Sequence, residues 1–181
     1  MAIIIGKMKD RQSGGAGISP EGLVSRLFSF PAIRRLGKSV PQGVWWIILA
    51  GSALRIAFFF IGENAGIDAL ARAQMTEEWL KHPDFRLVFA MWLPFHFWLM
   101  AGMAVLARNA ALGGRLLSLL LGIASLGACW ALAKEVYGVP AAKLSHLAFA
   151  LYSLHIGYST TSSSGAPYLF FVLSGMLGFF A

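Results

Sequence analysis

Five long apolar runs, separated by short polar stretches, follow a polar leader at the start of this chain. They cover Val44–Ile61, Leu87–Ala107, Leu116–Ala133, Ala142–Tyr158 and Ala166–Ala181. A helix that spans the hydrocarbon core of a bilayer needs about 20 mostly apolar residues, with a range of roughly 17–25. The first four runs reach this length and the last is marginal. The pattern therefore predicts an all-α, polytopic integral membrane bundle.

Composition supports the same class of protein. Hydrophobic residues make up 57% of the 181 positions and charged residues 13%, whereas an ordinary soluble domain has about 45–50% and about 25%. The alternating pattern of a membrane β-barrel is absent from the apolar runs. No internal repeat divides the chain, so we expect one transmembrane domain, residues 44–181, behind a tail of residues 1–43.

The tail is strongly basic. Only Asp10 and Glu21 oppose its positive charges there, and aromatic residues do not alternate with the basic ones as they do in single-strand nucleic-acid sites. We therefore expect no nucleic-acid partner. The positive-inside rule predicts that the N-terminus is cytoplasmic and that the protein lies in the inner (plasma) membrane. The basic residues of the tail are Lys7, Lys9, Arg11, Arg26, Arg34, Arg35 and Lys38.

Charge leaves the number of crossings open. If every run spans, Arg108 and Arg115 are cytoplasmic, whereas Lys134 and Lys143 are external. If Leu87–Ala107 instead lies on the external membrane surface, these assignments swap. Either topology places two of these basic residues on each side of the membrane, so the positive-inside rule does not choose between the topologies.

One polar loop, Gly62–Arg86, separates the first two runs and is external if the tail is cytoplasmic. Apolar side chains recur at helical spacing within it, so we expect an amphipathic interfacial helix over Ile67–Leu80. The loop holds five of the eight acidic residues of the chain: Glu63, Asp68, Glu77, Glu78 and Asp84.

Asp68 is the main candidate for chemistry in this loop. It falls on the first turn of the expected helix, where a carboxylate is favoured by the helix dipole, and Arg72 can reach it from four residues on. Such a carboxylate can act as a general base or ligate a divalent cation such as Mg or Mn. The alternative is that these charges only solvate the loop.

The order of segments resembles a known family. The loop is followed by a segment with Trp92 and Pro94, by a helix over Arg115–Gly138 with the sequence RLLSLLLGIASLGACWALAKEVYG, and by SSSGAPYLFF at Ser162–Phe171. This arrangement is similar to the N-terminal part of GT-C membrane glycosyltransferases, such as protein O-mannosyltransferases and the bacterial family 39 and 83 enzymes.

The resemblance implies a function and a topology. Asp68 would be the catalytic base, and the substrate-binding residues would be Arg72, Arg115, Ser163 and Ser164. The donor would be a polyprenyl-phosphate sugar from the bilayer, and the acceptor a glycan, a lipid or a protein. Residues 87–107 would form a juxtamembrane element, residues 134–143 would be cytoplasmic, and four spans would remain.

Two features depart from the family pattern. Gly165 stands where many relatives carry a second acidic residue, so a base-only mechanism without a protein-bound metal is the expectation. The family's enzymes are also several times longer, so the chain is expected to be a fragment or a shortened form, inactive by itself. The alternative function is a non-catalytic polytopic protein, either a transporter fragment or an assembly subunit.

Three further polar side chains fall within the apolar runs. Arg55 could contact a lipid phosphate or extend to the headgroups, and these alternatives stay open. His146 and His155 are expected on one helix, about 13 Å apart by its rise, which is too far to share a metal.

Overall fold

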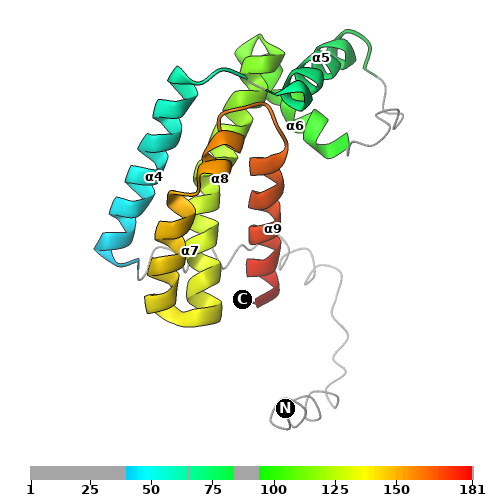
Figure 1. The fold of residues 1–181 in the computed structure, drawn as a ribbon. Coiled ribbons are helices and arrows are strands. Elements are labelled where there is room, and N and C mark those ends of the chain that lie inside the picture. Colours follow the sequence, from blue (N-terminus) through cyan, green and yellow to red (C-terminus); the bar gives the residue numbers. More distant parts are fainter. Residues whose placement is uncertain (1–39, 65, 84–93, 181) are drawn as a thin grey trace, which may run out of the picture. The chain divides into compact units, whose positions relative to one another are not determined.

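The computed structural model describes residues 40–64, 66–83 and 94–180, all within one compact unit, Ser39–Ala181. Regular structure in these ranges is entirely helical, as the sequence predicts (Figure 1). Nearly all of the predicted basic tail lies outside the described residues. The helices are α4 (Gln42–Ile61), α5 (Ile67–Lys81), α6 (Pro94–Ala107), α7 (Ala110–Ala150), α8 (Ser153–Tyr158) and α9 (Gly165–Phe180).

The long helix α7 reverses direction within its length. Gly138 has φ 80° and ψ 174°, a backbone conformation that glycine adopts far more readily than other residues, and Pro140 follows it. The chain folds back there, so that α7 consists of two arms (Figure 1). Trp130 of the first arm stacks edge-on against His146 of the second, with ring centroids 6.1 Å apart. The first arm contains the third apolar run, and the second arm together with α8 (Ser153–Tyr158) contains the fourth.

α7 forms the centre of the bundle, because α4, α6, α8 and α9 all pack against it. Val44 at the start of α4 is buried together with Trp130, Ala133 and Ala142 near the reversal. Close helix approach depends on small residues, as is common between membrane helices. At Gly113, for example, a Cβ would lie 2.5 Å from the backbone nitrogen of Ala104 in α6.

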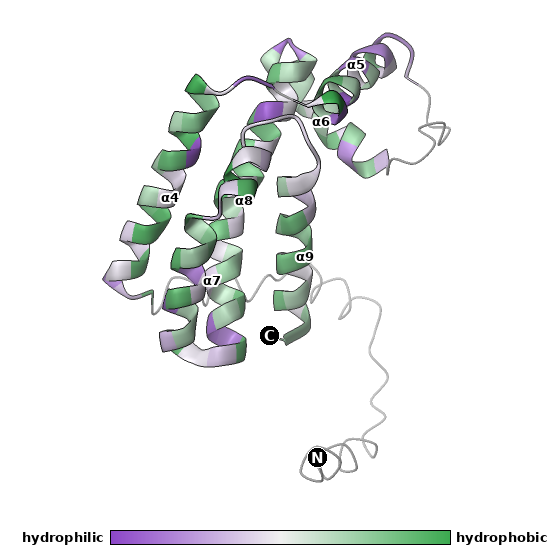
Figure 2. Cartoon of the chain, viewed as in Figure 1, coloured by the Kyte–Doolittle hydropathy of each residue, from purple (hydrophilic) through white to green (hydrophobic). Residues whose placement is uncertain are grey.

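Large apolar side chains are on the outside of the bundle. Figure 2 shows hydrophobic residues along α4 and α9 and hydrophilic ones gathered on α5. Phe60 and Ile61 of α4 are 79% and 76% exposed, and Phe179 of α9 is 84% exposed. Two helices in the described ranges, α4 and α7, are long and apolar enough to cross a membrane, whereas α6 and α9 are apolar but shorter.

Only part of the predicted run Leu87–Ala107 is described by the structure. α6 covers Pro94–Ala107, 14 residues, and residues 87–93 lie outside the described residues. α6 packs on α5 and α7.

α5 confirms the helix that the sequence predicts over Ile67–Leu80, and it ends at Lys81. Its buried face consists mainly of small residues together with Arg72. Ile67 and Leu70 belong to its apolar stripe and are 89% and 51% exposed. This start of the stripe therefore faces away from the protein, as expected of a helix that lies in a membrane interface, whereas Met75 and Trp79 are half-buried.

Candidate functional site

Asp68 lies on the first turn of α5, two residues after Gly66. Gly66 has φ 107°, which allows the chain to turn sharply from α4 into α5. The Asp68 side chain is 53% exposed and accepts a hydrogen bond from Arg72 Nε at 2.9 Å, whereas the Arg72 side chain is 9% exposed. The predicted i,i+4 pair is therefore present, and it combines an accessible carboxylate with a buried guanidinium.

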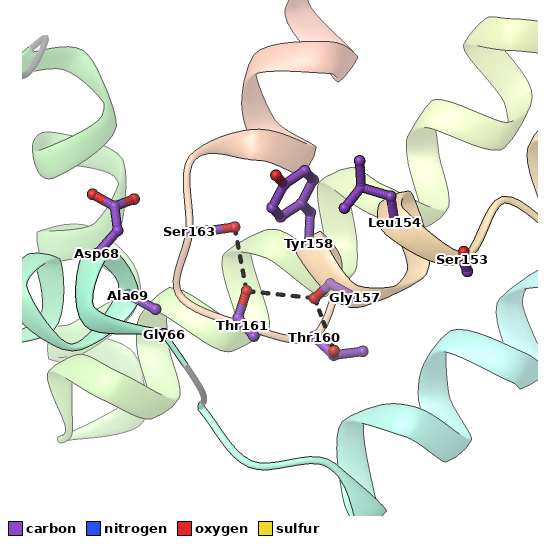
Figure 3. A pocket seen from close by; sticks show the side chains of 10 residues that line it. All are labelled: Gly66, Asp68, Ala69, Ser153, Leu154, Gly157, Tyr158, Thr160, Thr161 and Ser163. Atoms are coloured by element: carbon purple, nitrogen blue, oxygen red, sulfur yellow. Dashed lines mark hydrogen bonds between the residues drawn. The ribbon is translucent and has the colours of Figure 1, made fainter.

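A pocket of about 560 Å³ opens beside this carboxylate. Two segments more than eighty residues apart in the chain form it: the start of α5, and α8 with the loop 159–164. Figure 3 shows Asp68 and Tyr158 on either side of the loop that carries Ser163. The lining consists of Gly66, Asp68, Ala69, Ser153, Leu154, Gly157, Tyr158, Thr160, Thr161 and Ser163.

Hydroxyl groups hold the loop 159–164 in shape. Thr160 Oγ1 donates to the carbonyl of Gly157 at 3.0 Å, and Thr161 Oγ1 donates to Ser163 Oγ at 3.2 Å (Figure 3). Ser118 of α7 donates to the Ser163 carbonyl at 3.1 Å. The Ser- and Thr-rich stretch is therefore more than a polar helix terminus, because it forms one wall of the pocket.

Asn64 joins this loop to the segment between α4 and α5. Its Oδ1 accepts from the backbone N–H of Ser162 at 2.8 Å, and its Nδ2 donates to Ser162 Oγ, also at 2.8 Å. The single hydroxyl proton of Ser162 is then directed to the Ala69 carbonyl at 2.7 Å. The sequence does not indicate that Asn64 belongs to the site, because its partner is 98 positions away.

Arg115 lies near the start of α7 and makes contacts that the sequence does not indicate. Its Nε donates to the Thr160 carbonyl at 2.8 Å, and its Nη2 donates to the carbonyls of Gly62, at 2.7 Å, and Phe59. The guanidinium carbon lies 4.5 Å from the centre of the Phe59 ring. Arg115 thus connects the end of α4 to the loop 159–164 and does not line the pocket.

The predicted site residues are therefore only partly brought together. Asp68 and Ser163 line one pocket, and Arg72 is tied to Asp68. Ser164 does not line the pocket, and its carbonyl accepts from the Tyr168 N–H at 2.8 Å at the start of α9.

Gly165 begins α9 directly against an aromatic ring. A Cβ at this position would lie 2.8 Å from Cγ and Cδ2 of Tyr158, so any larger residue would displace the ring. Tyr158 thus takes the space that a second acidic side chain would need. Within residues 40–64, 66–83 and 94–180, no three His, Cys, Asp or Glu side chains are grouped so that they could hold a metal ion.

His96 of α6 is buried near the Asp68–Arg72 pair. Burial, and after it the charge of Arg72, lower the pKa of His96 from 6.5 to about 4. The Asp68 carboxylate and the backbone of Ser162 act in the opposite direction. The imidazole is therefore neutral at physiological pH and does not compete with Arg72 for the carboxylate.

A second polar cluster surrounds Arg55 where α7 ends and α8 begins. Both expectations for Arg55, contact with a lipid phosphate and extension to the headgroups, are wrong. The side chain is fully buried and contacts neither lipid phosphate nor solvent. Its Nη1 donates to the carbonyls of Gly51, at 2.9 Å, and Ala150, at 3.2 Å. Its Nη2 lies 3.0 Å from His155 Nδ1, which must accept because a guanidinium only donates.

The chain also breaks between the two histidines that the sequence places on one helix. α7 ends at Ala150 and α8 begins at Ser153, so the expected spacing of His146 and His155 along a continuous helix is wrong. Arg55 is directed at the last carbonyls of α7, where the negative end of the helix dipole favours a cation.

Comparisons with protein-family models, with curated proteins and with solved structures find no match to this chain.

Proposed function

We propose that this chain belongs to a membrane glycosyltransferase that transfers a sugar from a polyprenyl-phosphate donor to an acceptor on the extracytoplasmic face. The observation that carries the proposal is the half-exposed Asp68 carboxylate, fixed by Arg72 at the edge of a hydroxyl-lined pocket. Resemblance in segment order to GT-C enzymes supports the same assignment.

Packing supports a four-span topology within the proposal. The start of α4 is buried with the reversal of α7, so these parts lie at one end of the bundle. Arg115 ties the end of α4 to the pocket loop, which places the pocket at the other end. With a cytoplasmic tail, Lys134 and Lys143 at the reversal would be cytoplasmic as well, and Arg108 and Arg115 would be external.

The spans would then be α4, the first arm of α7, its second arm continued by α8, and α9. α5 and α6 would be juxtamembrane helices of the external loop. A lipid-linked donor would reach the pocket laterally from the outer leaflet. The acceptor, whether a glycan, a lipid or a protein, would approach from the aqueous side.

In the proposed reaction, Asp68 removes the proton from the acceptor hydroxyl as a general base. The acceptor oxygen attacks the anomeric carbon while the bond from that carbon to the phosphate oxygen breaks, and polyprenyl phosphate leaves with the bonding electrons. Arg72 orients the Asp68 carboxylate through the 2.9 Å hydrogen bond. A hard divalent cation such as Mg or Mn prefers several oxygen ligands, and one carboxylate among hydroxyls is a poor match, so no step is assigned to a metal.

The second candidate function is a non-catalytic membrane protein, either a transporter fragment or an assembly subunit. The buried Arg55 beside the break between α7 and α8 favours it, because transporters place ionisable residues on interrupted helices near the bilayer midplane. However, the hydrogen bonds of Arg55 are directed to protein carbonyls and to His155. This arrangement fits a structural arginine better than a residue of a transport path.

The decisive experiment compares Asp68→Asn with Glu77→Gln in membranes that contain the full-length protein. Transfer of radiolabelled sugar from a polyprenyl-phosphate donor is measured for each. Loss of a general base lowers the rate by about 10²–10⁴-fold, so Asp68→Asn should fall by at least about 100-fold. Glu77 is exposed on the same helix and serves as the matched control. Equal rates for wild type and Asp68→Asn would refute the proposed role.

A further inference from the structure

Tyr158 is the aromatic side chain of the pocket lining, and it is held in place from one side. It is the last residue of α8 and is 42% exposed. Gly165 contacts its ring so closely that a Cβ there would lie 2.8 Å from Cγ and Cδ2. The start of α9 therefore supports the ring, while the ring borders the pocket beside Leu154 and Gly157 (Figure 3).

The charge of the lining limits the ligand that this pocket accepts. Of the ten residues that line the pocket, one is charged, Asp68. The nearest arginines are engaged elsewhere, because Arg72 is buried and paired with Asp68, and Arg115 donates to backbone carbonyls. A phosphate in this pocket would meet the Asp68 carboxylate and no lining cation; pairing with Arg72 reduces the repulsion but leaves the phosphate without a cationic partner.

The remaining lining groups match an uncharged polyol. Five of the ten lining residues carry a hydroxyl, namely Ser153, Tyr158, Thr160, Thr161 and Ser163. Thr160 and Thr161 already donate within the loop and can accept from a sugar, whereas the other hydroxyls can donate as well. A pyranose ring also has a face of C–H groups that packs well on an aromatic ring, which presents a large apolar area.

We propose that Tyr158 is the stacking platform for an uncharged pyranose ring in this pocket, and that Gly165 is the residue that fixes the platform. Asp68, Thr161 and Ser163 lie in the lining to receive the hydroxyls of the sugar. The identification of that ring with a substrate rests on the proposed function, whereas its binding does not. The phosphate of a lipid-linked donor must then lie outside this pocket.

The test measures binding without turnover. The full-length protein in lipid nanodiscs is titrated with methyl hexopyranosides and with hexose 1-phosphates, and dissociation constants are obtained by saturation-transfer NMR. We expect the neutral glycosides to bind at least about tenfold more tightly than the phosphates. Asp68→Asn should narrow that difference by removing the repulsive charge.

Three variants test the platform. Tyr158→Phe keeps the ring and should bind glycosides within about threefold of wild type. Tyr158→Leu removes the ring and should weaken binding at least about tenfold, and Gly165→Ala should do the same by displacing it. Tyr168→Leu is the matched control, because Tyr168 is an exposed tyrosine of α9 outside the lining.

Several outcomes would overturn the platform: equal binding by Tyr158→Leu and wild type, a comparable loss in the Tyr168→Leu control, tighter binding of the phosphates, or no glycoside binding at all. The proposed function fails separately. If glycosides bind through Tyr158 while Asp68→Asn transfers sugar normally, the pocket binds sugar but the base assignment is wrong. If transfer depends on Asp68 while Tyr158→Leu binds normally, only the platform is refuted.

Discussion

The bundle contains two polar clusters, and they use their charges in opposite ways. Around Arg55, a fully buried guanidinium is directed at main-chain carbonyls and at one histidine nitrogen. At the pocket, the Asp68 carboxylate is half-exposed and retains room for a ligand. Ionisable residues in membrane proteins are in general candidates for a functional role. Here burial distinguishes the charge that maintains the fold, Arg55, from the charge that is available for chemistry, Asp68.

The Arg55 cluster shows how a bundle accommodates an interrupted helix. α7 ends at Ala150, so no further helical turn follows; the Phe149 carbonyl still accepts from the Tyr152 N–H at 3.3 Å. Arg55 donates to the carbonyls of Phe149 and Ala150 and also contacts His155, the residue that begins the last turn of α8. The pocket wall formed by α8 therefore depends on a residue that does not touch the pocket.

The largest expected effect follows from removing this guanidinium. Arg55→Met leaves the Ala150 carbonyl and the accepting nitrogen of His155 buried without their donor, whereas the Phe149 carbonyl keeps the Tyr152 N–H. Each buried acceptor left unsatisfied costs about 1–3 kcal/mol, so the two together cost about 2–6 kcal/mol. We expect the free energy of unfolding to fall by that amount, measured by denaturant unfolding in detergent micelles.

Lys143→Met is the control for Arg55→Met, since it also exchanges a cation for methionine but at an exposed position on α7. Equal stabilities for the two variants would show that Arg55 does not hold the break between α7 and α8. The conclusion that the buried Arg55 charge maintains the fold would then be wrong.

The next largest expected effect is a pH dependence of the folding stability that arises from His96. The pKa of His96 is lowered from 6.5 to about 4 in the folded chain. Above pH 6.5 the imidazole is neutral whether the chain is folded or unfolded, so the full stability is present. Between pH 6.5 and pH 4 only the unfolded chain takes up the proton, and stability is lost as the pH falls. The shift corresponds to a loss on the order of 3 kcal/mol.

His96→Gln isolates this contribution, because glutamine is polar but does not titrate in this range. Unfolding free energies of wild type and variant are compared at pH 7.5 and at pH 4. The wild type should lose more stability than the variant by the amount given above. Parallel losses would show that His96 takes up its proton equally in the folded and unfolded chain.

Sequence patterns predict the local elements of this fold well, because apolar periodicity and helix-end signals act within a few residues. α5 extends over Ile67–Lys81 where residues 67–80 were expected, and α9 over Gly165–Phe180 where residues 166–181 were. The acidic residue on the first turn of α5 and its pairing with Arg72 were also predictable, because i,i+4 spacing determines that contact.

The long-range pairings were not predictable from one sequence. Arg55 meets His155 across 100 positions, and Asn64 meets Ser162 across 98. No periodicity records such contacts, since they depend on how the helices pack. For the same reason Arg115, a basic residue near an expected site, was assigned to substrate, whereas the fold directs it to the carbonyls of Thr160 and Gly62.

The smallest expected effect concerns the contact that holds the pocket walls together. Asn64→Ala removes both hydrogen bonds to Ser162, which corresponds to about 1–2 kcal/mol of stability. Arg115 still ties the end of α4 to Thr160, so the bundle should remain folded. Amide hydrogen exchange of residues 159–164, measured by mass spectrometry, should accelerate while exchange at the reversal of α7 stays constant.

Glu63→Ala is the matched control, because the adjacent side chain is exposed and on the same segment. If exchange of residues 159–164 is unchanged in Asn64→Ala, the pocket wall is held by Arg115 and Ser118 alone. If exchange accelerates throughout the bundle, the pocket shares the stability of the Arg55 cluster, and the two clusters form one cooperative unit. Local acceleration alone supports a pocket that can adjust around a ligand while the rest of the bundle stays folded.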